Sequence, residues 1–462
     1  MSGNEAAGQR REIGWGGMIG YSISEIGVTG MVVFGSFYFF SYMTNTLGIP
    51  PLIAGSIFFA TKVFDVITDP LVGYLSDRTT GRMGPRRPWI LAGAFVMGPA
   101  LAIAFLAPFS ADSWVLNAVW FSAFLMLAYL GLTLIGVPYG AMTAEMTENY
   151  NRRSLITSIR MWTGTFGILM GAVGYAALTA NFGDLTIEGY RGGIFVILPL
   201  MIIPTLITVF ATRNVPVHRS TEVQHGFFDG LKIALSSRAF VILALSYILM
   251  VGMITVVTSN VNAMVEYMLE MDQSVMQILS AALLLPTILA IPVWAVVAMF
   301  IDKKLGLLIG GVIYAIGMAL IFTVGPGEIN KLMLFLVVMG VAYAAYQIFP
   351  WSMLPDVISE AQHTHGGSLA GLFNGWWTTA QKFGIALGPL LAGVALGIGG
   401  YVPSVDGVFA EQTPQAIDTL RWSVSLIPAL IFSVGVFVIL LYPLGRKDQE
   451  AIAQSAPGAE PA

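Results

Sequence analysis

Long apolar segments alternate with short polar connectors along the whole chain. Each segment holds about 20 or more mostly apolar residues, the length that an α-helix needs to cross the hydrocarbon core of a membrane. The first segment is longer than the apolar part of a secretory signal and lacks a small-residue cleavage motif, so we expect it to be retained as a helix. The pattern predicts twelve membrane-spanning helices, at residues 13–44, 51–75, 89–108, 114–142, 154–180, 192–212, 237–268, 274–300, 305–324, 331–354, 368–398 and 417–444.

The longest interior polar connector, residues 213–236, separates six of these segments from the other six. The fifth and eleventh segments are alike, because Trp162 follows Ser154 by eight residues and Trp376 follows Ser368 by eight. An internal repeat of this kind is typical of transporters built from two related halves. We expect a cytoplasmic N-terminal segment (1–12), an N-terminal six-helix bundle (13–212), a cytoplasmic central loop (213–236), a C-terminal six-helix bundle (237–444) and a disordered cytoplasmic tail (445–462).

The composition also indicates a membrane protein. Hydrophobic residues make up 56% of the 462 positions and charged residues 10%, whereas about a quarter of the residues of a soluble protein are charged. The connectors on one side of the predicted membrane carry sixteen Lys and Arg residues, and those on the other side carry three. Because the excess of positive charge stays in cytoplasmic loops, we expect both termini to be cytoplasmic.

Several classes of function are unlike this sequence. The net charge of -4 and the shortness of every basic cluster argue against nucleic-acid binding. The absence of cysteine excludes thiolate nucleophiles, iron–sulfur clusters and Cys-based zinc sites. The sequence also lacks a nucleophile–base pair and a phosphate-binding glycine loop, so we expect neither an enzyme nor a cofactor. The expected partners are a small-molecule solute and the lipid bilayer, with no obligatory protein partner.

Charged side chains within the predicted helices are the strongest functional signal. Each would cost about 2.5 to 3.5 kcal/mol at the centre of a bilayer if it faced lipid. We therefore expect them to face the interior of the protein, three negative against three positive. They are Glu25, Lys62, Asp65, Asp69, Arg160 and Lys382.

The second predicted helix carries a pair of acids on one face. Lys62, Asp65 and Asp69 are spaced i, i+3 and i+7, and the carboxylates lie one turn apart, with about 5 to 6 Å between their Cβ atoms. Two carboxylates this close and away from water cannot both ionise cheaply, so either one of them holds a proton or a cation lies between them. Thr68 adds a hydroxyl oxygen, a ligand that hard cations accept. The spacing predicts a coupling-ion site; the alternative is an ion network that ties this helix to its neighbours.

The connector after this helix predicts a cytoplasmic gate. It contains Asp77-Arg78 and then Arg82, Arg86 and Arg87. Charge pairs in such a turn would break when the two halves rock, and we expect Asp77, Arg78 and Arg87 to take part. Arg82 and Arg86 have an equally good explanation as residues that only set the topology. In the second half, Asp302-Lys303-Lys304 is a shortened version of this turn.

The run Phe64-Asp65-Val66-Ile67-Thr68-Asp69-Pro70-Leu71-Val72-Gly73-Tyr74, with Asp77-Arg78 and Gly84-Pro85-Arg86-Arg87-Pro88-Trp89, resembles the signature of the glycoside-pentoside-hexuronide:cation symporters, the melibiose permease family. The similarity continues through Val137-Pro138-Tyr139 and Pro355-Asp356. The resemblance implies an all-α membrane protein of the major facilitator fold, with 12 transmembrane helices in two six-helix halves. It also implies alternating access in the bacterial inner membrane.

The resemblance places the family's functional residues on numbered positions of this chain. Its cation site falls on Asp65, Thr68 and Asp69, helped by Thr133. Melibiose permeases have an asparagine where this chain has Thr68, so coupling to Na⁺ and coupling to H⁺ both stay open; if the ion is Na⁺, Asp65 and Asp69 are its expected ligands. Cavity-lining basic residues fall on Arg160 and Lys382, and Asp356 closes the tenth helix as an expected gating charge.

The sugar site is where the chain departs from that family. Its two hydroxyl-binding aspartates align with Thr29 and Gly136, and its stacking tryptophan aligns with Gly140. Glu25 lies one turn from Thr29 and could replace the missing acceptor, or it could pair with Lys62 or Arg160 as part of the structure. Aromatic side chains offer flat faces to a ring, and amides offer hydrogen bonds. The candidate solute-binding residues are Glu25, Thr29, Tyr139, Arg160, Trp162, Gln347, Trp351, Asn374, Trp377 and Lys382.

We expect a secondary active transporter that carries a sugar or glycoside together with Na⁺ or H⁺ by alternating access. One alternative is a cation-coupled carrier of a lysophospholipid or another amphipathic solute, because a cavity that has lost two carboxylates suits a more apolar or zwitterionic molecule. An alternative from another class is a membrane sensor that does not transport. A sensor usually needs an output domain, and the twelve segments leave no stretch of sequence for one.

Overall fold

The computed structural model describes residues 13–110, 113–147, 150–174, 185–213, 227–365 and 369–445. These residues form helices and turns with two isolated β-bridges, Leu47 to Val405 and Val405 to Val408, which confirms the all-α prediction. The predicted segment 1–12, most of the loop 213–236 and the tail from 446 onward lie outside the described residues. Eleven helices in the described part of the chain are long and apolar enough to cross a membrane.

The fifth predicted segment, 154–180, is not among these eleven helices of the described residues. Its described part is α6 (Tyr150–Leu169) followed by a π-helical turn, η3 (Met170–Gly174). Arg152, Arg153 and Arg160 make α6 more polar than the other long helices. Its polarity fits a helix that presents charge to the interior rather than to lipid.

The chain divides into two compact units. The first contains Met1–Gly35 and Phe64–Thr221, and the second contains Ser36–Val63 and Glu222–Ala462. Residues 36–63 therefore group with the second unit, although the sequence placed them in the N-terminal bundle. Close backbone packing explains the difference, because a Cβ atom on Gly55 would lie 2.4 Å from the carbonyl oxygen of Pro389.

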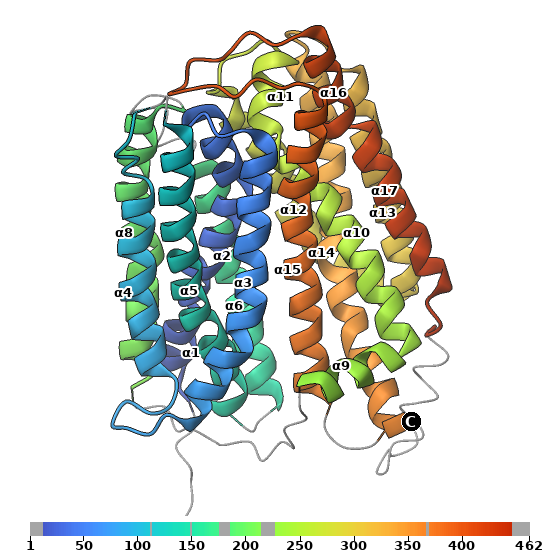
Figure 1. The fold of residues 1–462 in the computed structure, drawn as a ribbon. Helices are drawn as coiled ribbons and strands as arrows, with labels where there is room; N and C mark the ends of the chain where they lie inside the picture. The colour runs from blue at the N-terminus through green and yellow to red at the C-terminus, as the bar shows by residue number, and fades with distance from the viewer. Residues whose placement is uncertain are drawn as a thin grey trace, which may run out of the picture. The chain divides into compact units, whose positions relative to one another are not determined.

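The first unit consists of helices that run side by side (Figure 1). Its helices α2 and α6 touch backbone to backbone, since a Cβ atom on Gly167 would lie 2.6 Å from the carbonyl oxygen of Ile26. This contact brings Glu25 of α2 next to Arg160 of α6. Besides α6 and η3, the unit contains α1 (Trp15–Ser22), α2 (Ser24–Phe34), the second part of α3 (Pro51–Arg78), α4 (Arg87–Ala104), α5 (Trp114–Glu145) and α8 (Ile187–Ala211).

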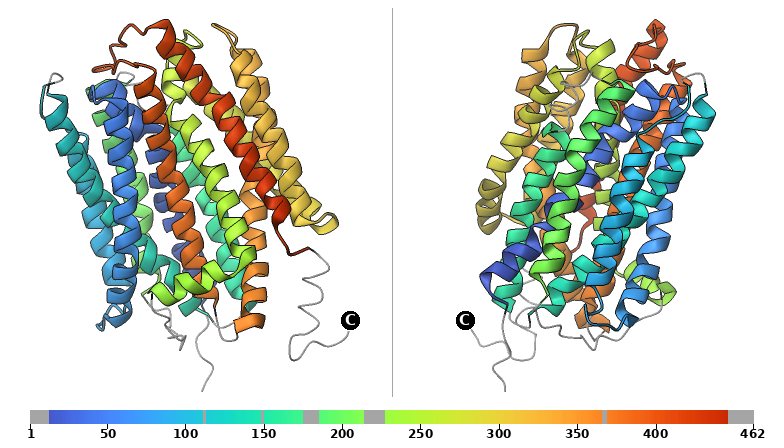
Figure 2. Two further views of the ribbon diagram at one scale, coloured as in Figure 1. Left: turned by 45° about the vertical axis from the view of Figure 1, so that its right-hand side comes forward. Right: turned by 90° about the vertical axis from the view of Figure 1, so that its left-hand side faces the viewer.

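The second unit holds the end of the first transmembrane segment and the helices of the C-terminal half (Figures 1 and 2). Helix α9 (Phe227–Ser236), within the connector predicted as a loop, packs against the ends of α10 and α15. The remaining elements are η1 (Gly35–Phe39), η2 (Tyr42–Thr46), α10 (Arg238–Ser259), α11 (Val261–Tyr267), α12 (Val275–Phe300), α13 (Lys303–Leu320), η4 (Ile321–Thr323), α14 (Ile329–His365), α15 (Ala370–Ile398), α16 (Pro414–Val424), α17 (Leu426–Val438) and η5 (Ile439–Leu441).

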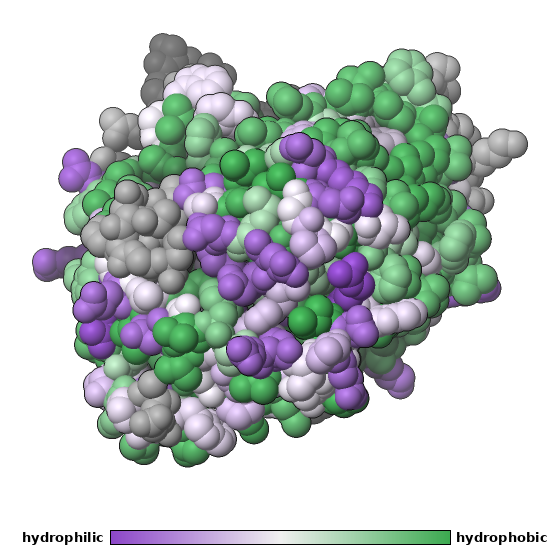
Figure 3. Space-filling view, turned by 90° about the horizontal axis from the view of Figure 1, so that it is seen from above, coloured by the Kyte–Doolittle hydropathy of each residue, from purple (hydrophilic) through white to green (hydrophobic). Residues whose placement is uncertain are grey.

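Large apolar side chains are exposed along the helices. Leu289 and Phe300 of α12 are 74% and 75% exposed. Viewed from the end where α11 and α16 lie, hydrophilic side chains gather on the end face and hydrophobic side chains prevail on the flanks (Figure 3). Apolar flanks of this kind are what a bilayer covers.

Candidate cation and solute sites

The two acids of α3 meet a threonine of α5 in the first unit. The Oγ1 atom of Thr133 lies 3.3 Å from Oδ1 of Asp65 and 3.1 Å from Oδ1 of Asp69. Asp65 is 1% exposed and Thr133 is 3% exposed. The hydroxyl has one proton and two carboxylate neighbours, so it ties both acids into one polar cluster. The structure thus brings together three of the four predicted cation ligands.

Thr68, the fourth predicted ligand, is buried on the same face of α3. Its hydroxyl lies 3.0 Å from the carbonyl oxygen of Phe64 and 3.2 Å from that of Asp65, and it donates to the backbone of its own helix. An oxygen that donates its proton to a carbonyl keeps its lone pairs for other partners. Carboxylate and hydroxyl oxygens together form a donor set for a hard cation.

Lys62, the basic residue of the alternative ion network, is buried one helical turn before Asp65. Its Nζ atom lies 5.7 Å from the centre of the Phe58 ring. A cation over an aromatic face gains about 0.5 to 2 kcal/mol. The aromatic contact stabilises the ammonium group away from water. It is compatible both with a coupling-ion site at the acid pair and with an ion network that includes Lys62.

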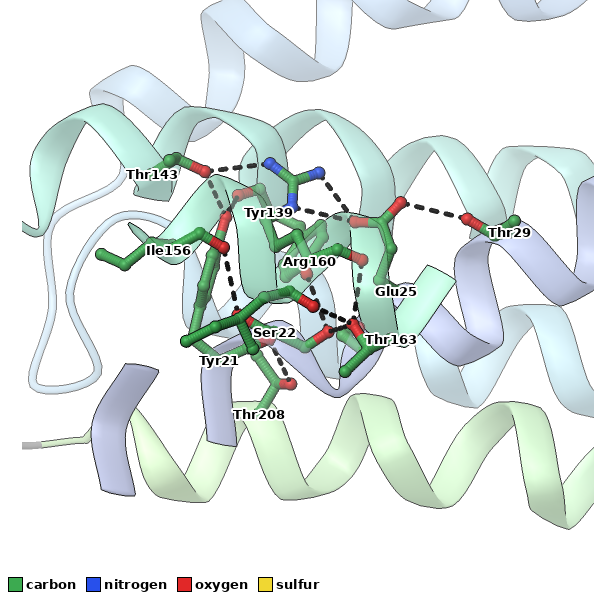
Figure 4. A network of polar contacts seen from close by, with 12 residues as sticks. Tyr21, Ser22, Glu25, Thr29, Tyr139, Thr143, Ile156, Arg160, Thr163 and Thr208 are labelled. Atoms are coloured by element: carbon green, nitrogen blue, oxygen red, sulfur yellow. Dashed lines mark hydrogen bonds and ion pairs between the residues drawn. The ribbon is translucent and has the colours of Figure 1, made fainter. Parts of the chain in front are cut away.

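Glu25 and Arg160 form an ion pair in the first unit (Figure 4). Oε2 of Glu25 accepts hydrogen bonds from Nε of Arg160 at 2.9 Å and from Nη2 at 2.8 Å. Oε1 of Glu25 accepts a hydrogen bond from Thr29 at 3.1 Å. Of the two partners that the sequence left open for Glu25, the structure shows this direct pairing with Arg160.

Two tyrosines and a threonine fix the guanidinium group in place. Its Cζ atom lies 4.5 Å from the centre of the Tyr139 ring, and Nη1 donates to Thr143 at 3.0 Å. The Tyr21 hydroxyl lies 2.6 Å from Oγ1 of Thr143 and donates to the carbonyl oxygen of Tyr139 at 2.5 Å. These contacts therefore give Arg160 a defined orientation. The sequence analysis missed Tyr21 and Thr143, although Thr143 shares a helical face with Thr133.

The first transmembrane segment is broken beside this ion pair. The amide of Ile26 bonds to the carbonyl of Ile23 at 3.1 Å, so the carbonyl of Ser22 loses its usual partner four residues ahead. Side-chain hydroxyls replace that partner, because Thr163 donates to the Ser22 carbonyl at 2.8 Å and Tyr139 at 3.4 Å. The break and the ion pair thus share Tyr139 as a common support.

Open space lies along the face of α5 between the acid pair and the ion pair. A Cβ atom added at Gly136 or Gly140 would meet no atom within 4 Å. Thr133 and Thr143 lie on the same helical face at either end of this stretch, because the four positions follow the spacing of helical turns. At these two positions, where the resembling family has an aspartate and a tryptophan, the described neighbours leave room for a side chain.

The aromatic candidates of the second unit meet edge to face in one cluster. Trp377 is fully buried, and its ring centre lies 4.6 Å from that of Tyr247 and 5.8 Å from that of Trp351. Its Nε1 atom has no hydrogen-bond partner among the described residues. Trp351 is 41% exposed. Trp351 is thus the reachable face of this pair, and Trp377 supports it.

The other candidates have different environments. Trp162 is 68% exposed and packs edge-on against Phe166 at 5.0 Å. Gln347 and Lys382 are half-buried, and Asn374 is exposed. The solute-binding roles of these four residues stay predictions.

The predicted gating residue Asp77 pairs with Arg86 rather than with Arg78. Nη2 of Arg86 lies 2.5 Å from Asp77 and 2.5 Å from Glu145 at the end of α5. Burial alone would lower the pKa of Arg86, but the hydrogen bond and charge of Glu145, together with Asp77, raise it. Arg78 instead lies over the ring of Tyr74 at 4.0 Å. Sequence reasoning assigned Arg86 an equally good role in topology and missed Glu145.

The second unit contains an analogous ion pair. Nζ of Lys303, at the start of α13, lies 2.6 Å from Oδ2 of the predicted gating residue Asp356 on α14. The same group donates to the carbonyl of Ser352 at 2.9 Å. In both units a basic residue at the start of one helix thus pairs with an acid near the end of the next. Arg87, the remaining gating candidate, is half-buried at the start of α4.

Comparisons with known proteins match most of the chain. A family model described as MFS/sugar transport protein matches residues 20–446. An uncharacterized symporter of Synechocystis is 25% identical, with 90% of this chain and 92% of the relative covered. The glucuronide carrier protein homolog of Escherichia coli is 22% identical, with 96% and 95% covered. Sodium-dependent lysophosphatidylcholine symporter 1 of Gallus gallus is 26% identical, with 89% and 83% covered.

Solved structures confirm the major facilitator fold. A bacterial homolog of the human lysosomal transporter Spinster, in an inward-facing conformation, gives a TM-score of 0.66 at 16% identity, with 92% of this chain and 95% of that chain covered. The nucleoside transporter NupG gives 0.61 at 17% identity, with 92% and 99% covered. Together with the family model and the named symporters, these matches show that the chain is a multi-pass membrane transporter rather than an enzyme. It is a cation-coupled symporter and belongs to the MFS/sugar transport protein family.

Proposed function

We propose that this symporter lies in the inner membrane with both termini in the cytoplasm. In this proposal it moves a sugar or glycoside into the cell together with Na⁺ or H⁺. The observation that carries the proposal is the contact of Thr133 with both Asp65 and Asp69. Two neighbouring carboxylates with a shared hydroxyl and little water favour one bound cation or one shared proton. A site of this kind can drive uptake because its occupancy follows the ion gradient across the membrane.

The proposed solute lies along α5 between the acid pair and Arg160. Gly136 and Gly140 leave space there, and Tyr139 and Arg160 border it with an aromatic ring and a fixed cation. A guanidinium group binds hydroxyl or carboxylate oxygens in a defined geometry. The glucuronide carrier homolog among the relatives supports a glycoside, including one with an acid group.

Glu25 then has a double role in the proposal. In the structure it pairs with Arg160, and its second oxygen accepts a hydrogen bond from the hydroxyl of Thr29. A solute hydroxyl or carboxylate that approaches Arg160 competes with Glu25 for the same donors. Solute binding therefore changes the partners of both residues, and a bound cation at the acid pair offsets the charge of an acidic solute.

A lysophospholipid is the second candidate solute. The named relatives include sodium-dependent lysophosphatidylcholine symporters, of which the one from Gallus gallus covers most of this chain. The open face at Gly136 and Gly140 also suits a chain of methylene groups, and Arg160 suits a phosphate. This alternative keeps the cation site and changes the cargo.

Thermal stability of the purified protein separates these possibilities. A ligand that binds the native state raises the melting temperature by mass action. The scan covers sodium, lithium and pH, and then glycosides, pentoses, uronic acids and lysophospholipids with the best cation present. If a sugar raises the melting temperature only when the cation is present, the result supports the proposal. If only a lysophospholipid raises it, the result supports the second candidate solute instead.

Matched variants test the cation site. We expect Asp65→Asn, Asp69→Asn and Thr133→Ala to weaken the cation-dependent shift in melting temperature. Thr61→Ala is the control, because Thr61 is a buried threonine of α3 whose hydroxyl donates to the backbone carbonyl of Ile57. An unchanged cation response in both aspartate variants would refute the site.

A further inference from the structure

The segment between α15 and α16 is tied to the end of the first transmembrane segment. We call residues 401–412 the strap; it lies at the upper end in Figure 1. The amide of Ser404 bonds to the carbonyl of Thr44 at 3.0 Å, and the amide of Asp406 bonds to the carbonyl of Thr46 at 2.9 Å. These carbonyls belong to the last turn of the helix, where carbonyls lack helical partners. The strap therefore caps the helix and pairs Val405 with Leu47 in a β-bridge.

A tight turn shapes the strap at its contact with the helix. Asp406 has φ +48° and Gly407 has φ +75°, and the turn pairs Val405 with Val408. Two central residues with positive φ are the mark of a type I′ turn, for which Asp-Gly is a preferred sequence. The Asp406 amide that bonds to the helix end belongs to this turn, so the helix contact depends on the backbone shape of the turn.

The rest of the strap is fastened within the second unit. The hydroxyl of Tyr267 on α11 lies 3.3 Å from Oγ of Ser404 and donates to the carbonyl of Ala410 at 2.8 Å. Gln412 donates to the Tyr267 hydroxyl at 3.2 Å. Because α11 holds the strap in place, the helix end can leave the strap only if the contacts of Thr44, Asn45 and Thr46 break.

The helix end under the strap is closed to solvent. Thr44 and Asn45 are 2% exposed and Thr46 is 0% exposed. The hydroxyl of Tyr401 in the strap donates to Oδ1 of Asn45 at 3.1 Å. This helix end belongs to the second unit, whereas α2, earlier in the same transmembrane segment, belongs to the first. The segment that carries Glu25 is thus anchored by its far end to the strap.

We propose that the strap is an outer latch, which holds the first transmembrane segment closed and must release it before a solute can enter from outside. The inference rests on the proposed orientation, in which this end faces away from the cytoplasm, and on alternating access. The latch sets the population of the outward-open form, because a more stable latch leaves less of the form that is competent to bind external solute.

Cysteine pairs test whether the latch forms in the membrane. The chain has no cysteine, so an introduced pair has no competing thiols. We expect Leu47→Cys with Val405→Cys to form a disulfide under mild oxidation, because the partners of an antiparallel bridge lie within disulfide range. Leu47→Cys with Val402→Cys is the control; three residues along an extended strand displace the thiol by about 10 Å. Equal cross-linking of both pairs would overturn the latch.

Labelling of a buried position tests whether the latch opens. Thr46→Cys is treated with a membrane-impermeant maleimide from the outer face of intact cells. Gly407→Val strains the turn, because a β-branched residue rarely adopts positive φ, whereas Gly407→Asn keeps a residue that tolerates it. We expect labelling at least about tenfold faster with Gly407→Val, which corresponds to about 1.4 kcal/mol, and near the original rate with Gly407→Asn.

The outcomes separate the latch from the proposed function. Equal labelling rates in the original, Gly407→Val and Gly407→Asn backgrounds would refute the latch, as would rapid labelling when the strap is intact. If Gly407→Val fails to fold, the cross-linking comparison still decides, because its cysteine pairs leave the positive-φ residues Asp406 and Gly407 unchanged. Neither measurement needs a solute, so an unsuccessful solute screen would refute the proposed cargo and leave the latch standing.

Discussion

Replacement of Arg160 tests the ion pair most directly. In Arg160→Gln, the carboxylate of Glu25 loses both guanidinium contacts and keeps the hydroxyl of Thr29. Its side chain is 12% exposed and that of Arg160 is 18% exposed, so water replaces little of what is lost. The remaining carboxylate is then a poorly compensated charge in the interior of the first unit.

The magnitude follows from the burial of the pair. Removal of one partner of a buried ion pair costs about 3 to 5 kcal/mol, whereas replacement of both partners by neutral groups of similar size is often close to neutral. The Thr29 hydrogen bond places Arg160→Gln at about 3 kcal/mol, the lower end of that range. Glu25→Gln leaves Arg160 on the Tyr139 ring and Thr143, so we expect about 1 to 2 kcal/mol from the lost charged hydrogen bonds.

A double-mutant cycle in detergent measures the coupling. We expect Glu25→Gln/Arg160→Gln to be more stable than Arg160→Gln alone, because the double variant removes the unpaired charge. The assay is the free energy of unfolding by denaturant, or the melting temperature at fixed detergent. The control cycle uses Glu328 and Lys331, an exposed ion pair at 3.1 Å, for which we expect no measurable coupling. Strictly additive losses at Glu25 and Arg160 would refute the reasoning.

Three further predictions concern packing, the ion pair of Arg86 with Glu145, and pH. Gly167→Val should lower stability by about 1 to 3 kcal/mol through overpacking, since its Cβ would lie 2.6 Å from a carbonyl of α2. Gly136→Ala meets open space inside a helix, where alanine is favoured over glycine, so it should not lower the unfolding midpoint. Arg86→Gln should cost about 3 kcal/mol by leaving Glu145 in a buried site, and Arg86→Lys should cost less; equal losses in unfolding assays would contradict this. Burial raises the pKa of Glu266 despite the hydrogen bond of Gln273, so the folded state binds this proton more tightly than the unfolded chain. Relative to Glu266→Gln, the original protein should gain stability as the pH falls from about 7 towards the unfolded pKa of about 4.3; parallel pH profiles would refute the prediction.

The sequence placed three of the candidate cation ligands next to one another because they are local. Asp65, Thr68 and Asp69 share one helix, so helical spacing alone places them on one face. Thr133 came from the family resemblance, and the structure places it against both acids. Such a set of neighbours survives any error in the packing of distant helices.

The ion pairs were harder to predict because they join distant parts of the chain. Glu25 and Arg160 are 135 residues apart, and Arg86 and Glu145 are 59 apart. The sequence left both Lys62 and Arg160 open as partners of Glu25, and it ranked Arg87 above Arg86 as a gating residue. The close contact at Gly167 and the direction of each side chain decide these pairings, and neither can be read from charge type alone.

The sequence by itself determined that this is a helical membrane protein with interior charges. A bilayer offers no hydrogen bonds to the backbone, so long apolar segments must become helices whatever their neighbours are. The tertiary structure alone decided that the first segment breaks at Ile23, that Ser22 finds Thr163, and that the strap reaches Thr46. These contacts depend on which helices pack together and at what depth, and many distant residues share in that choice.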